Sequence, residues 1–232
     1  MSGTDLPIGV VPFSSVLVEV VVQSIEDLLA ARVGSADRVE VCVDLAVGGL
    51  TPPLTLVRDV VAAAGPVGVH VLVRSRPGDY VYTPAEVSDM VASIEAVDAA
   101  GAAGVVVGAL TAEGVVDVDS CRRMIDAAGR MSVTFHRAFD VAGDPFAALE
   151  AIADLGCDRI LTSGQATTAP EGAAVLRRLV ERSAGRLVIL AGGGIRAGNV
   201  AQLIDESGVS EIHFSLAGAG GVDATLAAAR LA

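Results

Sequence analysis

Residues 131–140 read MSVTFHRAFD, an apolar run that ends on His136 and Arg137 and is followed by Asp140. The run is short and almost continuously apolar until its end, which is typical of a parallel strand that is covered on both faces. Polar side chains at the carboxyl end of such a strand indicate a site in an α/β barrel. The alternative is that they merely finish a core strand, at a cost in stability.

Seven more runs of the same kind occur along the chain. They span residues 16–22, 38–43, 67–73, 104–110, 159–162, 186–191 and 209–215. Segments with helical spacing lie between them, at residues 24–33, 84–100, 119–128, 144–155 and 170–183. Eight strand–helix units in 232 residues, of which 52% are hydrophobic, predict one (β/α)8 TIM barrel. We expect a single domain over residues 15–232 after a loose tail at 1–14, with a doubly wound open sheet as the alternative.

A faint internal repeat supports the barrel. Ser35-Ala36-Asp37-Arg38 precedes the second run, and Gly156-Cys157-Asp158-Arg159 precedes the sixth, four units later. Arg38 and Arg159 open their strands, so we expect them at the structural, amino-terminal end of the barrel.

The composition excludes several function classes. The net charge of −12 argues against nucleic acid or an anionic membrane as a partner. All 16 basic side chains are arginine, so a lysine Schiff base is impossible and any anion must be held by arginine or backbone N–H groups. The N-terminal stretch lacks the basic region of a secretory signal, and no apolar run reaches about 18 residues. We therefore expect a cytoplasmic protein.

The polar residues of the runs share faces. Alternate residues of a barrel strand point into the closed interior, which normally holds branched apolar side chains. On the predicted inner faces lie Glu19, Glu40, Cys42, His70, Arg74, Arg76, Thr134, His136, Glu211, His213 and Ser215. Buried charges need partners or a ligand, so these side chains predict a site; Glu19 could instead simply pair with an arginine.

Two glycine-rich stretches follow the last two runs. Residues 191–194 read AGGG and residues 215–221 read SLAGAGG. The loops after strands seven and eight of a barrel often bind phosphate through backbone N–H groups. Gly192, Gly193 and Gly194 therefore predict an anion site, with a tight turn as the alternative.

Several motifs together resemble the CutC family, which is linked to copper homeostasis. They are ADRVEVCVDLAVGGLTP, VHVLVRSRPGDYVYT, VTFHRAFD, DRILTSGQ, the GGGI and NV stretch, and EIH, in this order between residues 16 and 215. The resemblance implies a cytoplasmic, homo-oligomeric TIM barrel with a deep polar pocket. The matching positions are Glu19, Glu40, His70, Arg74, Asp79, His136, Arg137, Asp140, Thr162, Ser163 and Gly192–Gly194.

The resemblance also implies copper(I), which prefers soft thiolate ligands. The family pattern places a cysteine near the end of the first strand and another in the second. Here Val21 occupies the first position, and Cys42 keeps the second. Cys121 and Cys157 have no ligand partner nearby in the sequence, so we expect only weak copper(I) binding at Cys42; Cys42 could also be an ordinary core residue.

Three functions remain open. The first is copper handling. The second is an enzyme that acts on a small phosphorylated or carboxylated compound by acid–base chemistry; its acid–base candidates are Glu19, Glu40, His70, His136 and Asp140. The third is a ligand sensor without turnover. The candidates for binding an anionic ligand are Arg74, Arg76, Asp79, Arg137, Thr162, Ser163, Gly192, Gly193, Gly194, His213 and Ser215. We expect Arg74 to face the ligand rather than to neutralise Glu19 or Glu40.

Overall fold

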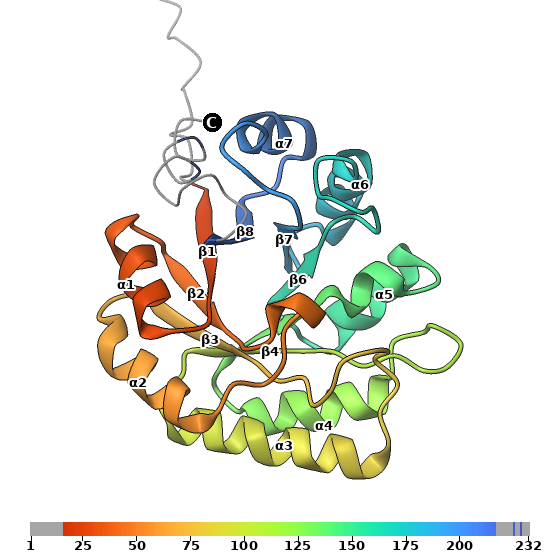
Figure 1. The fold of residues 1–232 in the computed structure, drawn as a ribbon. Helices are drawn as coiled ribbons and strands as arrows, with labels where there is room; N and C mark the ends of the chain where they lie inside the picture. The colour runs from red at the N-terminus through yellow and green to blue at the C-terminus, as the bar shows by residue number, and fades with distance from the viewer. Residues whose placement is uncertain (1–15, 217–224, 226–227, 229–232) are drawn as a thin grey trace, which may run out of the picture.

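Eight parallel strands form a closed barrel in which each strand pairs with the next and β8 pairs with β1 (Figure 1). The structure is a computed structural model that describes residues 16–216, 225 and 228. The strands are β1 (Leu17–Val22), β2 (Arg38–Val41), β3 (Gly68–Leu72), β4 (Gly104–Val107), β5 (Ser132–Phe135), β6 (Arg159–Thr162), β7 (Val188–Gly192) and β8 (Glu211–Ser215). Closure confirms the predicted (β/α)8 barrel and excludes the open sheet. The predicted tail at 1–14 and most of the glycine-rich stretch at 215–221 lie outside the described residues.

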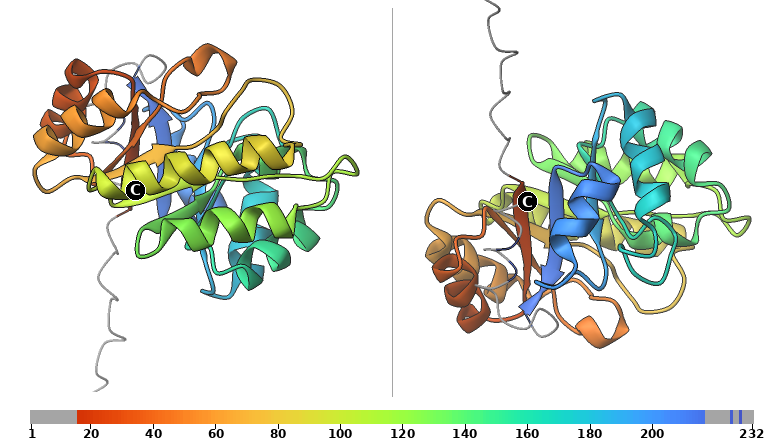
Figure 2. Two further views of the ribbon diagram at one scale, coloured as in Figure 1. Left: turned by 90° about the horizontal axis from the view of Figure 1, so that it is seen from below. Right: turned by 90° about the horizontal axis from the view of Figure 1, so that it is seen from above.

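Helices surround the barrel, as the two further views make clear (Figure 2). They are α1 (Ile25–Val33), α2 (Leu54–Ala64), α3 (Pro84–Ala99), α4 (Val118–Ala128), α5 (Pro145–Asp154), α6 (Ala173–Ser183) and α7 (Val200–Ser207), with short 3-10 helices η1 (Leu45–Val47) and η2 (Arg137–Val141). None of the described helices is long and apolar enough to cross a membrane. The helices cover the outer face of the strands, whose outward apolar side chains, such as Val20, Ile160 and Phe214, belong to the main core.

Four of the predicted strands, β2, β3, β4 and β5, end earlier than their apolar runs. Leu110 lies beyond β4 and forms an isolated antiparallel bridge with Val116, and Val43 does the same with Leu50. His136 lies beyond β5, because its side chain caps the amino terminus of η2. Apolar residues past a strand end therefore fold back over the barrel instead of lengthening it.

The internal repeat has a structural counterpart. Asp37 accepts a hydrogen bond from the backbone N–H of Val18 at 2.9 Å, and Asp158 accepts one from Val133 at 2.7 Å. Each aspartate precedes a strand and binds the strand before it, so both fix the register at the amino-terminal end of the barrel. The equivalent contacts in β1–β2 and β5–β6 agree with the repeat seen in the sequence.

The inner face of the barrel is split between apolar and polar residues. Val21, Cys42, Leu72 and Val106 form a small buried cluster of their own, separate from the main core. The charged and imidazole side chains of the inner face occupy the remaining interior. The barrel therefore places its polar groups next to a small apolar wall.

Candidate functional site

An ionic network fills the amino-terminal end of the barrel interior. Arg38 binds Glu19 through Nε and Glu211 through Nη2, the latter at 2.6 Å. Arg159 also binds Glu211, at 3.0 Å. Arg38 and Arg159 therefore have the structural role that their positions predicted. Removal of one partner from such a buried pair costs roughly 3–5 kcal/mol, so this end of the barrel holds the fold together.

Glu19 links this network to His213. Its Oε1 lies 2.7 Å from Nδ1 of His213, and the carboxyl is fully buried. Burial opposes its ionisation, but the hydrogen bond from His213 and the charge of Arg38 lower the pKa of Glu19 well below its usual range. Burial likewise opposes the charged imidazole, yet Glu40 and Glu19 raise the pKa of His213. Glu19 therefore stays ionised, and it holds the pKa of the hydrogen-bonded His213 above its usual value.

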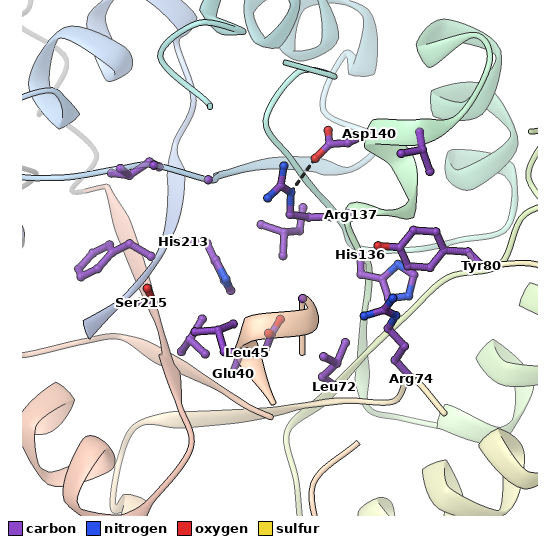
Figure 3. A pocket seen from close by; sticks show the side chains of 18 of the residues that line it. Glu40, Leu45, Leu72, Arg74, Tyr80, His136, Arg137, Asp140, His213 and Ser215 are labelled. Atoms are coloured by element: carbon purple, nitrogen blue, oxygen red, sulfur yellow. Dashed lines mark hydrogen bonds and ion pairs between the residues drawn. The ribbon is translucent and has the colours of Figure 1, made fainter. Parts of the chain in front are cut away.

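A cavity of about 510 Å³ opens at the carboxyl-terminal end of the barrel (Figure 3). Its position is where barrel proteins carry their sites. The predicted residues that line it are Glu40, Arg74, His136, Arg137, Asp140, Gly193, Gly194, His213 and Ser215. The strand ends thus bring together side chains that lie up to 175 residues apart, from 40 to 215, in the sequence.

Glu40 is a carboxyl group of the cavity with an unpaired oxygen. It is buried, and its Oε2 has no hydrogen-bond partner among the described residues. Burial raises the pKa of Glu40 to about 7; the charge of His213 lowers it and that of Glu19 raises it. Glu19 and Glu40 therefore differ in kind: the first stays ionised, and the second can gain or lose a proton near neutral pH.

The other two histidines are uncharged. Burial and the charge of Arg74 lower the pKa of His136 to about 3. Burial lowers the pKa of His70 to about 4, against the charge of Glu19 that raises it. The ring of His70 occupies the space that Gly104 leaves, where a Cβ would come within 2.5 Å of Nε2. His136 is in the cavity wall, and His70 is not.

Arg74 is in the cavity wall, and two of its three guanidinium nitrogens are already bound, whereas Nε is buried without a hydrogen-bond partner among the described residues. Nη1 donates to the carbonyl oxygens of Val47 at 2.9 Å and Gly49 at 3.1 Å, and Nη2 donates to that of Gly78 at 3.0 Å. The guanidinium also lies 4.9 Å from the ring centre of Tyr80. Arg74 does not neutralise Glu19, since Arg38 does so. It joins the loops after β2 and β3.

Asp140 holds Arg137 in place at the rim. Its Oδ2 accepts from Nε of Arg137 at 2.7 Å, and its Oδ1 accepts from Oγ1 of Thr162. Ser163 donates to Asp140 through its backbone N–H and accepts from Nη2 of Arg137 at 3.0 Å. We therefore interpret Asp140, Thr162 and Ser163 as residues that position Arg137, which alone of the four keeps an exposed side chain facing the cavity.

Several predicted site residues do not line the cavity. They are Glu19, Cys42, His70, Arg76, Asp79, Thr162, Ser163 and Gly192. Arg76 lies on the outer rim, where it binds Asp79 at 2.9 Å and Glu86 at 2.6 Å. The alternation that grouped Arg76 with Arg74 fails because β3 ends at Leu72, and beyond a strand the period of two no longer applies.

Two polar residues of the cavity were not among the predicted site residues. Tyr80 comes from the loop between β3 and α3, and its ring centre lies 5.0 Å from that of His136. Arg196 lies in the loop after β7, and its side chain is exposed at the cavity. Tyr80 lies in the motif RPGDYVYT, and Arg196 directly follows the GGGI stretch. These two motifs were the sequence features that could have identified both residues.

One group of side chains in the barrel interior offers donor atoms that could hold a metal ion. Among the described residues, Glu19, Glu40 and His213 offer ligand atoms within 4.8 Å of one another, but both oxygens of Glu19 already bind Arg38 and His213. This set holds no sulfur. Cys42 is buried among apolar side chains, and burial raises the pKa of its thiol to about 12, so it is not a thiolate. The described residues do not fit copper(I), which prefers thiolate sulfur.

The closed (β/α)8 barrel, with acidic, histidine and arginine side chains around a cavity at its carboxyl-terminal end, makes this protein a TIM barrel. A sequence profile of the CutC family matches residues 16–218. A CutC family protein of Bacteroides fragilis (strain YCH46) is 46% identical over 202 residues, 86% of this chain and 79% of that relative. One from Histophilus somni (strain 2336) is 43% identical over 198 residues, 85% of this chain and 81% of its own length.

The fold agrees with the sequence comparison. The crystal structure of a CutC protein from Streptococcus agalactiae, whose name links it to copper homeostasis, superposes with a TM-score of 0.82 at 29% identity and covers 85% of this chain and 97% of its own. The chain therefore belongs to the CutC family. The name of the Streptococcus agalactiae protein refers to copper homeostasis. In this chain, the described side chains do not fit copper(I).

Proposed function

We propose that this protein is an enzyme that moves a proton on a small anionic metabolite bound in the barrel cavity. One observation carries the proposal: Glu40 lines the cavity with an unpartnered Oε2 and a pKa of about 7, close to the hydrogen-bonded pair Glu19–His213. Two carboxyl groups with pKa values pushed in opposite directions are a recurring feature of acid–base sites. Glu40 is the proton-transfer group, and Glu19 is the fixed charge that orients His213.

The rim supplies the anion-binding end. Nη1 of Arg137 lies near Gly193, where a Cβ would come within 3.4 Å of it. Gly193 and Gly194 have φ values of 103° and 71°, a conformation that favours glycine and leaves their backbone open to a ligand. Arg196 adds a second exposed guanidinium at the same place. Arginine forks bind carboxylate or phosphate through two hydrogen bonds, so the ligand is expected to carry one of these groups.

The chemistry follows from the charges. Glu40 as carboxylate takes a proton from a carbon next to a carbonyl group of the ligand, and the C–H electron pair forms a C=C bond. The carbonyl π pair moves to oxygen, which accepts a proton from the imidazolium of His213. Reversal of these steps returns the proton to carbon. A base with a pKa near the working pH suits this transfer, and such catalysis contributes about 10²- to 10⁴-fold.

The experiment is deuterium exchange in D2O. Pyruvate and dihydroxyacetone phosphate serve as a 2-oxo acid and a phosphorylated ketone, and mass spectrometry follows deuterium at the carbon next to the carbonyl. We expect exchange above the buffer rate with at least one probe, and a loss of roughly 10²- to 10⁴-fold in Glu40→Gln. Glu95→Gln, on the exposed face of α3, is the matched control and keeps the full rate.

Exchange that is equally fast in Glu40→Gln contradicts the role of Glu40. Saturable binding of a probe without any exchange would instead favour the ligand sensor. Copper handling is the third candidate, supported by the family association alone, and it requires tight copper(I) binding that depends on Cys42.

The remaining expectations are proposals of the same kind. We propose a cytoplasmic protein that assembles as a homo-oligomer, as the family resemblance implies, and that binds neither nucleic acid nor membrane, as its charge of −12 implies. Light scattering on the full chain measures the assembly. A mass of one 23.3 kDa chain would contradict it.

A further inference from the structure

The hydrogen bond at Nδ1 determines which ring nitrogen of His136 carries the proton. The backbone N–H of Ala138 donates to Nδ1 of His136 at 3.2 Å. Nδ1 must therefore offer a lone pair, and in the neutral imidazole the proton is on Nε2. The bond is local, because His136 caps η2, so it forms whenever η2 forms. His136 thus presents an N–H donor, and not a lone pair, at Nε2.

That donor has no partner among the described residues. Nε2 of His136 is buried and makes no hydrogen bond. A buried donor left unpaired costs roughly 1–3 kcal/mol, so its position calls for an acceptor from outside the chain. The ring lies in the cavity wall beside Tyr80 and Arg74, as Figure 3 shows, and neither offers a carboxylate.

Packing holds the ring in this place. A Cβ at Gly108 would lie 2.7 Å from Cε1 and Nδ1 of His136, so the imidazole occupies the space that this glycine leaves. Phe135 packs edge-on against the imidazole, with 5.9 Å between the two ring centres. The ring of Tyr80 lies on the cavity side, with its centre 5.0 Å from that of His136. The ring itself is fixed.

We infer that His136 is an uncharged hydrogen-bond donor to a carbonyl oxygen of the ligand, which is therefore a carbonyl compound as well as an anion. The inference rests on the proposed function, because it gives the ligand class of the same cavity. An acceptor oxygen that reaches Nε2 would satisfy the orphaned donor. An alcohol oxygen at that position would be a weaker match, since it gains no negative charge during proton transfer.

The charge state supports this role and excludes another. Burial and the charge of Arg74 lower the pKa of His136 to about 3, so the ring is neither a base nor an imidazolium at neutral pH. A neutral imidazole donates without giving up its proton, which suits an oxygen that becomes partly negative while Glu40 takes the proton from carbon. The pKa of His213 is shifted in the opposite direction, raised by Glu40 and Glu19, so the two rings have different tasks.

The first test is a ¹⁵N NMR titration of the histidine side chains in the full chain. The chain has three histidines, so single His→Gln variants assign them. We expect His136 to keep the neutral Nε2–H form from pH 8 to pH 5. Protonation above pH 5, or a proton on Nδ1, overturns the inference. This result is independent of turnover, so it stands apart from the exchange experiment.

The second test compares dihydroxyacetone phosphate with glycerol 3-phosphate by calorimetry. The two share the phosphate and differ in carbonyl against alcohol. We expect a preference of roughly threefold to tenfold for the carbonyl compound, the size of one hydrogen bond. His136→Phe should abolish the preference, and His136→Gln, which keeps an N–H donor, should keep part of it. Equal affinities in the wild-type chain, or no binding of either compound, overturn the carbonyl assignment.

Discussion

Replacement of Arg74 by methionine is the sharpest test of how the cavity is held open. The guanidinium of Arg74 donates to the carbonyl oxygens of Val47, Gly49 and Gly78 at 2.9, 3.1 and 3.0 Å, and it lies against the ring of Tyr80. Only 3% of the residue is exposed. Methionine keeps much of the apolar stem but removes all three hydrogen bonds between two loops.

The magnitude follows from those bonds. A hydrogen bond that involves a charged group contributes about 1.5–3 kcal/mol, so three of them would give at most about 9 kcal/mol. The three carbonyls lie in loops near the cavity mouth, where water can replace part of what the guanidinium gave. We therefore expect Arg74→Met to lower the free energy of unfolding by about 3–5 kcal/mol, a large share of the 5–15 kcal/mol typical of a domain. The sequence alone had favoured a small change.

Urea denaturation with linear extrapolation measures the loss. Arg76→Met is the matched control, because Arg76 is half-buried on the rim and its pairs with Asp79 and Glu86 are screened by solvent; it should cost no more than about 1 kcal/mol. A loss below about 1 kcal/mol for Arg74→Met, equal to the control, would refute the loop-joining role and restore the ligand role for this arginine.

Three further outcomes follow from the same structure. Glu40 is protonated in both the folded and the unfolded chain below pH 4.5, and between pH 4.5 and about 7 the unfolded chain loses this proton first. The free energy of unfolding should therefore fall by roughly 3 kcal/mol across this range in the wild type and not in Glu40→Gln. Urea denaturation at several pH values measures the change, and an equal pH dependence in both proteins would show that the carboxyl has an ordinary pKa. Copper(I) should bind weakly in competition with a strong chelator, and tight one-to-one binding lost in Cys42→Ser would reverse this conclusion. Fragments 1–129 and 130–232 should not fold alone, because β8 pairs with β1 to close the barrel; cooperative unfolding of either one would contradict this.

Strand periodicity was enough to predict the fold and the inward faces. The eight apolar runs and the alternation along them placed Glu40, His136 and His213 in the interior, and all three line the cavity. The helices α2 and α7 were not marked from the sequence. Neither begins with a side-chain capping bond of the kind that Thr83 provides for α3, although α6, which was marked, lacks one as well.

The roles of the inward residues could not be predicted, because they depend on register and loop paths. Glu19 is opposite Arg38 in β2 and His213 in β8, and only this register shows that both of its oxygens are engaged. Tyr80 and Arg196 lie in loops, where no period applies. Alternation gives the direction of a side chain, whereas its partners come from strands and loops far away in the sequence.

The proposed function requires that Glu40 exchange a proton near neutral pH while Glu19 stays ionised. A ¹³C NMR titration of the glutamate side chains, with Glu40→Gln and Glu19→Gln for assignment, measures it directly. We expect the carboxyl of Glu40 to titrate at about pH 7 and that of Glu19 to remain ionised at pH 4. Titration of Glu40 near its ordinary value of 4.5 would contradict the proposed function at its source.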